Sequence, residues 1–208
     1  MFRGDRIFET LLMLSIKVKL VMKISLVSSS TRAGRASHRV GLLLKKQIEK
    51  MPGWSVSLID LAGYALPVFQ ERVGYLEEVP VDVRLISEEL KSSDGIIFIT
   101  PEYNGGISSA LKYVIDIFGD EEFGGKPIGV ATASAGVQGG IRAALQLQQM
   151  ILAIRAYPQP EMLLVPLVAE TISESGDVSD SNFEVKVRRF IHSFLTFTSH
   201  LKQLRLAV

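Results

Sequence analysis

The sequence predicts an α/β fold, a doubly wound sheet of five parallel strands with helices on both faces. From Met22 onward, short β-branched apolar runs alternate with longer segments of helical period, which is the pattern of parallel strands joined by crossover helices. The runs are nearly continuous in Ile, Leu, Val and Phe, as expected of strands buried on both faces. A length of 208 residues allows one sizeable core but not two ordinary domains with a linker. We therefore expect one domain over residues 22–208.

The predicted strands set the order of the sheet. They are Lys23–Ser28, Ser55–Leu61, Gly95–Thr100, Pro127–Ala133 and Met162–Pro166. Right-handed crossovers between five such strands most simply give the order 2-1-3-4-5 in a three-layer α/β/α arrangement. A ligand of such a sheet binds beyond the C-terminal ends of its strands. We therefore expect function in the loops after the first, third and fourth strands.

Apolar residues at helical spacing predict the helices. The stripe between the first two strands consists of Val40, Leu43, Leu44 and Ile48. The stripe after the fourth strand consists of Ile141, Leu145, Ile151 and Leu152. The last stripe, on a helix that should close the domain, consists of Phe183, Val187, Phe190, Ile191, Phe194, Thr198 and Leu201.

Residues 1–21 are expected to be an N-terminal extension. Basic residues interrupt their apolar runs, so no stretch is long enough to cross a bilayer, and no cleavage site of a secretory signal follows them. Met22 stands directly before the first strand, as an initiator would. The alternative is an extra edge strand over residues 14–20.

Composition excludes several classes of partner and chemistry. With 23 Lys and Arg against 22 Asp and Glu, the formal charge is +1, so no global field favours nucleic acid or an anionic membrane. The chain has no cysteine, which removes thiolate nucleophiles and thiolate metal sites and is consistent with a cytoplasmic location. Redox chemistry would have to come from a cofactor.

The loop after the first strand carries hydroxyls and guanidiniums directly before a helix. Its sequence is Ser28-Ser29-Ser30-Thr31-Arg32-Ala33-Gly34-Arg35-Ala36-Ser37. Backbone N–H groups at a helix start and serine hydroxyls suit phosphate oxygens, and arginines add charge-assisted contacts. The candidate phosphate ligands are Ser30, Thr31, Arg32, Arg35 and Ser37. The alternative is that Ser37 merely caps the helix and the serines form a polar turn.

The loop after the third strand suits a flat heteroaromatic ring. It consists of Pro101-Glu102-Tyr103-Asn104-Gly105-Gly106, before a helix expected over Ile107–Phe118. The glycines allow close approach of the backbone to a ligand, and Tyr103 offers an aromatic face. A tight turn between strand and helix would use the same residue types, and composition does not decide between the two.

Two separate motifs resemble those of the NADPH-dependent FMN reductase family, which has a flavodoxin-like fold. Residues 29–37 resemble its G-S-T-R-x-G-R-x-S phosphate loop, and Pro101-Glu102-Tyr103-Asn104 matches its P-E-Y-N isoalloxazine loop. Further similarity to the family's L-K-N-A-I-D, G-K-P and L-P segments is found at Leu111-Lys112 with Ile115-Asp116, at Gly125-Lys126-Pro127 and at Leu66-Pro67. The resemblance covers residues 23–165. Three positions depart from the pattern: Ser29 replaces a glycine, Ser108 a proline, and Tyr113 an asparagine.

The resemblance implies a set of cofactor ligands. Ser30, Arg32 and Ser37 would hold the FMN phosphate, and Arg35 could instead meet the phosphate of NADPH. The flavin ring would be framed by Pro101, Glu102, Tyr103, Asn104 and Gly105. In the loop after the fourth strand the resemblance assigns Ser134, Gly136 and Gly139 to the flavin site, and leaves Gly140 as a turn residue.

The loop after the fourth strand also suggests a different class of enzyme. Ala133-Ser134-Ala135-Gly136 is similar to the nucleophile elbow of serine hydrolases, and Asp177 and His192 follow in the right chain order. Against this alternative, Thr132 occupies the first glycine position and no oxyanion segment is found. His192 and His200 are expected on the surface, and His38 at the start of a helix.

The family resemblance implies an FMN-dependent oxidoreductase. NADPH or NADH would reduce bound FMN in a ping-pong reaction, and the flavin would then reduce a small acceptor such as a flavin, quinone, azo dye or metal oxyanion. No catalytic side chain and no metal are expected, because the cofactor performs the chemistry. A flavin-binding electron carrier is the alternative, although such carriers tend to be acidic and this chain is not. The resemblance also implies a homodimer or homotetramer, with Ile107, Leu111, Ile115 and Phe118 near the interface.

Overall fold

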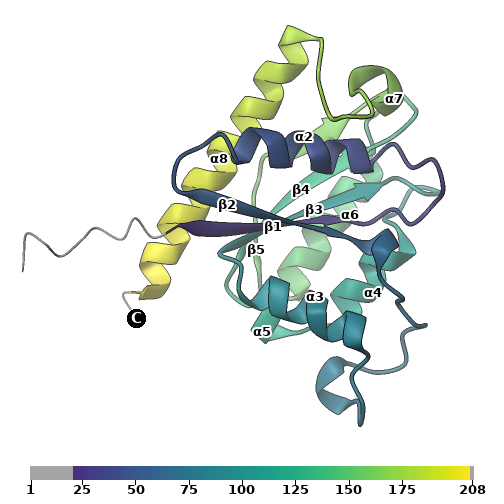
Figure 1. The fold of residues 1–208 in the computed structure, drawn as a ribbon, viewed down its shortest axis with the longest axis vertical. Helices are drawn as coiled ribbons and strands as arrows, with labels where there is room; N and C mark the ends of the chain where they lie inside the picture. The colour runs from purple at the N-terminus through teal and green to yellow at the C-terminus, as the bar shows by residue number, and fades with distance from the viewer. Residues whose placement is uncertain (1–20, 207–208) are drawn as a thin grey trace, which may run out of the picture.

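A parallel sheet runs through the protein, whose computed structural model describes residues 21–206. Its strands lie in the order β2-β1-β3-β4-β5, with β6 also paired to β4, and Figure 1 shows the sheet between layers of helices. The bounds are β1 Met22–Ser28, β2 Trp54–Asp60, β3 Gly95–Pro101, β4 Pro127–Ala133, β5 Tyr157–Pro158 and β6 Leu163–Val165. The predicted order 2-1-3-4-5 is confirmed.

The fifth position of the sheet differs from the prediction, because two short strands share it. Residues of β5 pair with Pro127 and Ile128, and those of β6 with Ala131 to Ala133 further along β4. Pro158 ends β5 and Pro160 follows it, and both lack the N–H that a continuous ladder needs. The single strand expected over Met162–Pro166 is therefore only three residues long.

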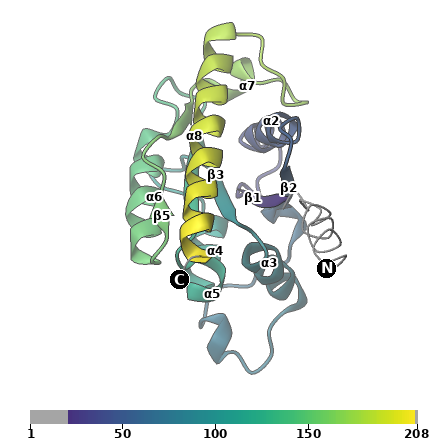
Figure 2. The ribbon, with the colours of Figure 1, turned by 90° about the vertical axis from the view of Figure 1, so that its left-hand side faces the viewer.

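Helices cover both faces of the sheet, as predicted. One face carries α2 and α8, and the other carries α3, α4, α5 and α6. Figure 1 shows α2 above the strands and α3, α4 and α5 below them, and Figure 2 shows α2 beside the upper half of α8. The bounds are α2 His38–Ile48, α3 Val81–Lys91, α4 Ser109–Ile117, α5 Asp120–Phe123, α6 Ile141–Ala153, α7 Val168–Thr171 and α8 Ser181–Leu206, with short 3-10 turns at Leu61–Gly63 and Val73–Tyr75.

The strands separate two hydrophobic cores. Along β3, Ile96 and Phe98 pack into the core beneath α3, α4 and α6, whereas Ile97 and Ile99 pack into the core beneath α2 and α8. This alternation follows from the two-residue period of a strand. Because both faces of β3 are buried, its run of apolar residues is continuous rather than alternating.

The apolar stripe predicted for α6 is wrong in part. The helix buries Ala143, Ala144, Leu147 and Ile151, whereas Leu145 and Leu152 are 54% and 64% exposed. Apolar residues lie on most sides of this helix, so their spacing alone selects no unique buried face.

The N-terminal extension expected over residues 1–21 lies, apart from Val21, outside the described residues. Between Val21 and Leu206, no helix has the length and apolar character that a membrane crossing requires.

Candidate functional site

The three loops that the sequence singles out meet at the C-terminal edge of the sheet. We call them the first loop (residues 29–37, after β1), the third loop (residues 102–106, after β3) and the fourth loop (residues 134–140, after β4). A cavity of about 270 Å³ lies between them. These loops, the adjoining strand ends and α7 supply its lining: Ser30, Arg32, Ala33, Gly34, Arg35, Ala36, Ser37, Pro101, Glu102, Tyr103, Ala133, Ser134, Ala135 and Val168.

Five predicted site residues do not line this cavity. Thr31 faces a larger neighbouring cavity. The others belong to turns of the third and fourth loops, and they are Asn104, Gly105, Gly136 and Gly139.

The first loop presents a run of free backbone donors. Within the described part of the chain, the N–H groups of residues 30–38 donate to no acceptor. Gly34 has a φ of +68°, a left-handed conformation found in the backbone concavities that bind anions. The run leads into the N-terminus of the 11-residue helix α2, where the helix dipole adds positive potential.

Ser37 adds a buried hydroxyl to these donors. Its Oγ is buried and has no hydrogen-bond partner among the described residues. Ser37 is the N-cap of α2, but its side chain makes no capping bond. Ser37 thus occupies the N-cap position without a side-chain capping bond, and a buried polar atom without a partner is unfavourable by about 1–3 kcal/mol.

The two arginines of the first loop have different surroundings. The Arg32 guanidinium is exposed and lies over the Tyr103 ring, 5.5 Å from its centroid. The Arg35 guanidinium donates to both carboxylate oxygens of Asp60, and its Nη1 also donates to the Ser30 carbonyl at 2.7 Å. Arg35 thus lines the cavity, as predicted, with its donors directed to protein oxygens.

Sequence reasoning missed Asp60 and the role of His38. Asp60 ends β2, opposite Ser28 of β1 in the sheet register. Burial opposes its ionisation, but the hydrogen bonds from Arg35 and from the Ala62 N–H outweigh burial and hold its pKa below the usual value. An acidic residue at the end of the neighbouring strand was the available signal.

His38 joins the same cluster. Its Nδ1 lies 3.0 Å from Ser28 Oγ and 3.7 Å from Asp60 Oδ2. Burial lowers the pKa of His38, the Asp60 carboxylate opposes that shift, and the Arg35 charge adds to it. His38 begins α2, as predicted.

The third loop is a tight hairpin. The Tyr103 N–H donates to the Gly106 carbonyl at 2.9 Å, and the Gly106 N–H returns a 3.0 Å bond to Tyr103. Between them Asn104 and Gly105 have φ values of +51° and +79°, which is why Asn and Gly occupy these positions. The Tyr103 hydroxyl lies 2.6 Å from Ser30 Oγ and so joins the third loop to the first.

Glu102 contributes its side chain to a helix. Its Oε2 accepts hydrogen bonds from the N–H groups of Arg142 and Ala143 at 3.0 and 3.4 Å, and its Oε1 accepts from the Arg142 guanidinium at 3.2 Å. A carboxylate at the N-terminus of α6 is stabilised by the helix dipole. The main-chain N–H of Glu102 donates to the Ala133 carbonyl at 3.2 Å, so Glu102 lines the cavity without a free donor.

Two departures from the family motifs contact each other. Ser108 Oγ donates within 2.8 Å of Ser29 Oγ and 3.0 Å of the Ser29 carbonyl, and it also accepts from the Leu111 N–H at the start of α4. Both serines are buried. The hydroxyl that Ser29 introduces therefore has a partner in the hydroxyl that Ser108 introduces.

Two of the three glycines of the fourth loop, Gly139 and Gly140, are required by the backbone. Gly139 has a φ of +64°, and a Cβ at this position would lie 3.0 Å from Leu164 Cβ. Gly140 has a φ of +84°, and its Cβ would lie 3.0 Å from Thr132 Cβ. Close packing against β4 and β6 thus explains both glycines.

The residues of the hydrolase alternative are not assembled. Ser134 Oγ donates to the Gly136 carbonyl at 2.8 Å. The Asp177 carboxylate accepts from Ser175 and Lys46, and His192 is exposed on α8. Within the described chain, therefore, the three groups make no mutual hydrogen bond, and no cluster of three His, Asp or Glu side chains could hold a metal.

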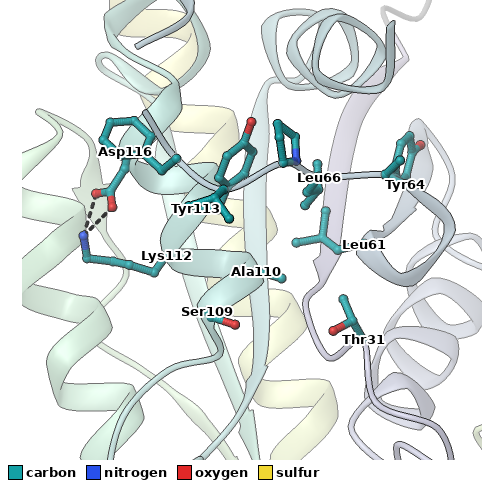
Figure 3. A pocket seen from close by; sticks show the side chains of 13 residues that line it. Thr31, Leu61, Tyr64, Leu66, Ser109, Ala110, Lys112, Tyr113 and Asp116 are labelled. Carbon is teal, nitrogen blue, oxygen red and sulfur yellow. Dashed lines mark hydrogen bonds and ion pairs between the residues drawn. The ribbon is translucent and has the colours of Figure 1, made fainter. Parts of the chain in front are cut away.

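A larger cavity of about 650 Å³ adjoins the first loop on its other side. Figure 3 shows Thr31 and Leu61 on one side, Tyr64 and Leu66 above, and Tyr113 of α4 facing them. The Lys112–Asp116 ion pair lies at its edge, with Nζ 2.6 Å from the carboxylate. Aromatic and aliphatic side chains predominate in this lining.

Comparison with known proteins assigns the chain. The model of a family described as NADPH-dependent FMN reductase matches residues 22–169. The chain belongs to this family. An NAD(P)H-dependent FMN reductase of Pseudomonas aeruginosa is 32% identical over 145 residues, which are 67% of this chain and 73% of that protein. A quinone reductase of Escherichia coli is 30% identical over 120 residues, 55% of this chain and 64% of that protein.

Solved structures agree on the fold. The NAD(P)H:acceptor oxidoreductase FerB of Paracoccus denitrificans superposes with a TM-score of 0.75 at 24% identity, covering 86% of this chain and 98% of that one. An NADH:FMN oxidoreductase superposes with a TM-score of 0.68 at 15% identity, covering 84% and 89%. As a member of the FMN reductase family, the chain is a flavodoxin-like oxidoreductase that uses FMN and a reduced nicotinamide.

The residues of the cavity fit FMN. Free amides, the unpartnered Ser37 hydroxyl and the Arg32 guanidinium are the donors that a phosphate dianion requires. Tyr103 and the main chain of the third loop offer the aromatic and hydrogen-bonding surfaces that suit a flat heteroaromatic ring.

Proposed function

We propose that the FMN phosphate binds in the first loop and that the flavin ring lies against the third and fourth loops. The observation that carries this placement is the combination of unpaired N–H groups over residues 30–38 with the unpartnered Ser37 hydroxyl. Such a set of donors lowers the free energy of an anion more than that of any neutral ligand.

Each loop has its own task in this proposal. Ser30, Ser37, the exposed Arg32 and the main-chain N–H of Thr31 hold the phosphate, although the Thr31 side chain faces the neighbouring cavity. Arg35 acts within the loop, because Asp60 already occupies its donors. The ring lies against Pro101 and the main chain of residues 102–105. Ser134 borders it, and Gly136 and Gly139 shape the fourth loop.

FMN, when bound, accepts a hydride from a reduced nicotinamide and passes electrons to a second substrate. The chain has to bind and orient the reactants, so that they reach near-attack geometry. No side-chain acid or base is assigned. NADPH or NADH and the acceptor would use the same open face in turn, which gives ping-pong kinetics.

The acceptor is proposed to be a small molecule, such as a free flavin, a quinone, an azo dye or a metal oxyanion. Relatives named quinone reductase and FMN reductase support the first two of these classes. The chain's charge of +1 gives no steering toward a large charged partner.

We also propose that the protein is a homodimer or homotetramer. Leu111, Ile115 and Phe118 are buried within the chain, and Ile107 is partly buried against the same core. An interface near α4 would therefore use other residues of that helix than the four first expected. Light scattering of the purified protein measures the oligomeric state.

Mixing the purified protein with NADPH under nitrogen tests the reductase function. Rapid bleaching of the flavin band, followed by its return when a quinone is added, is expected. Parallel lines in double-reciprocal plots at several quinone concentrations would support the ping-pong order. Slow or absent bleaching by both nicotinamides would indicate an electron carrier instead, and a colourless protein that does not bind added FMN would overturn the cofactor site.

A further inference from the structure

We propose that Asp60 is a positioning residue for FMN, because it acts through Arg35 to hold the first loop in the conformation that presents its N–H groups to the phosphate. The proposal rests on the placement of the phosphate given above. Asp60 itself does not line the cavity.

The contacts of Arg35 form a bridge between two segments far apart in sequence. Asp60 belongs to β2 and is fixed by its register with Ser28 of β1. Its carboxylate also accepts from the Ala62 N–H at 3.2 Å, at the start of the following turn. Arg35 binds both carboxylate oxygens and the Ser30 carbonyl. The guanidinium therefore ties the first loop to the end of a rigid strand.

The bond to the Ser30 carbonyl sets the direction of a peptide group. No peptide bond of the described chain is cis, and the C=O and N–H of a trans peptide point to opposite sides. With the Ser30 oxygen held by Arg35, that oxygen cannot turn toward an anion, and the Thr31 N–H stays free of protein acceptors. A loop fixed in this way binds phosphate without first being ordered.

If Asp60 acted only through its charge, Asp60→Asn would change the affinity for FMN in the direction opposite to the one that positioning predicts. Asp60→Asn removes a negative charge close to the proposed phosphate and leaves the Arg35 charge unpaired. Coulomb attraction alone would then make FMN bind more tightly. Positioning predicts weaker binding, so the sign of the change separates the two explanations.

The experiment compares FMN with riboflavin, which lacks the phosphate, on the apoprotein. Dissociation constants are measured from the quenching of flavin fluorescence for the wild type and for Asp60→Asn. We expect the FMN constant to rise at least tenfold, about the effect of having to order one more loop residue on binding, and the riboflavin constant to stay unchanged. A loss of general stability would weaken both ligands alike.

A second variant, Arg35→Lys, keeps the positive charge at this position but loses the planar, forked shape of the guanidinium. Arg35→Lys retains one positive charge, but an ammonium cannot form the forked contact with a carboxylate and a carbonyl. We expect the same selective loss of FMN binding, and this variant carries the test if Asp60→Asn does not fold. Asp177→Asn is the matched control, because Asp177 also pairs with a basic residue, Lys46, and neither residue lines the cavity. It should change neither constant.

Each outcome has one meaning. Wild-type protein that binds riboflavin as tightly as FMN would overturn the placement of the phosphate itself. Wild-type protein that prefers FMN, with tighter or unchanged FMN binding in Asp60→Asn or in Arg35→Lys, would overturn the role of Asp60 alone.

Discussion

Replacement of Ser37 by alanine should change the stability of the apoprotein and the affinity for FMN in opposite directions. Among residues 21–206, the buried Ser37 hydroxyl has no hydrogen-bond partner, and such a group destabilises the folded state by about 1–3 kcal/mol. Its removal should therefore stabilise the apoprotein by about 1 kcal/mol or more. The usual loss on removing an N-cap serine does not apply, because this side chain makes no capping bond.

The affinity for FMN should fall in the same variant. A hydrogen bond from a hydroxyl to a charged phosphate contributes about 1.5–3 kcal/mol, so Ser37→Ala should raise the dissociation constant about 10- to 150-fold. For a domain of this size, 1 kcal/mol corresponds to a change of about 2–4 °C in Tm. Thermal denaturation of apoprotein and fluorescence titration with FMN measure the two quantities.

Ser87→Ala is the control for this experiment. Ser87 is also a buried serine, but its Oγ donates to the Glu122 carboxylate at 2.6 Å, far from the first loop in sequence. Its replacement should lower the apoprotein Tm and leave FMN affinity unchanged. A lower Tm for apo Ser37→Ala, or an FMN constant within twofold of the wild type, would refute the reasoning about Ser37.

Three further predictions test other parts of the structure. Arg32→Ala should raise the FMN constant about 10- to 150-fold and change apoprotein stability by no more than about 0.5 kcal/mol, since the side chain is exposed; unchanged affinity in fluorescence titration removes Arg32 from the site. Ser108→Pro suits the φ of −66° at that position, but it removes the N–H that donates to Thr100 Oγ1 and the Oγ that accepts from the Leu111 N–H. It also leaves the buried Ser29 hydroxyl without its partner, and this last effect alone should cost about 1–3 kcal/mol in urea denaturation. In the double variant Ser29→Gly/Ser108→Pro, removal of the Ser29 hydroxyl should recover part of the lost free energy of unfolding. If the stability changes of the two single variants simply add, the two hydroxyls do not interact and the prediction is wrong. Burial lowers the pKa of Lys126 to about 8 from 10.5. Below pH 8 the buried ammonium therefore destabilises the folded state to its full extent. This destabilisation is relieved as the pH rises to 10.5, because the folded protein loses the proton while the unfolded chain still holds it. The stability of the wild type relative to Lys126→Met should therefore increase over that window, and a constant difference would be incompatible with the lowered pKa.

The sequence predicted the central strands of the sheet more accurately than the strands at its edge or the buried faces of its helices. Strands β1 to β4 were predicted to within two residues because their continuous apolar runs have one explanation, burial on both faces. The edge of the sheet at β5 and β6 was predicted less well. Prolines near β5 interrupt the hydrogen bonds to β4, and where this happens depends on how the segment lies alongside β4. The buried face of α6 was missed in part, because a helix with apolar residues on most sides carries no directional signal.

The sequence by itself determined the family and the three loops, because hydroxyls, arginines and glycines that follow buried parallel strands must gather at one edge of the sheet. Only the tertiary structure decided which of those side chains remain free for a ligand. Arg32 and Arg35 are three residues apart, yet one is exposed and the other is bound to Asp60, whose position depends on the pairing of β2 with β1. Hydrogen bonds between segments distant in sequence are set by packing, and local composition carries no record of them.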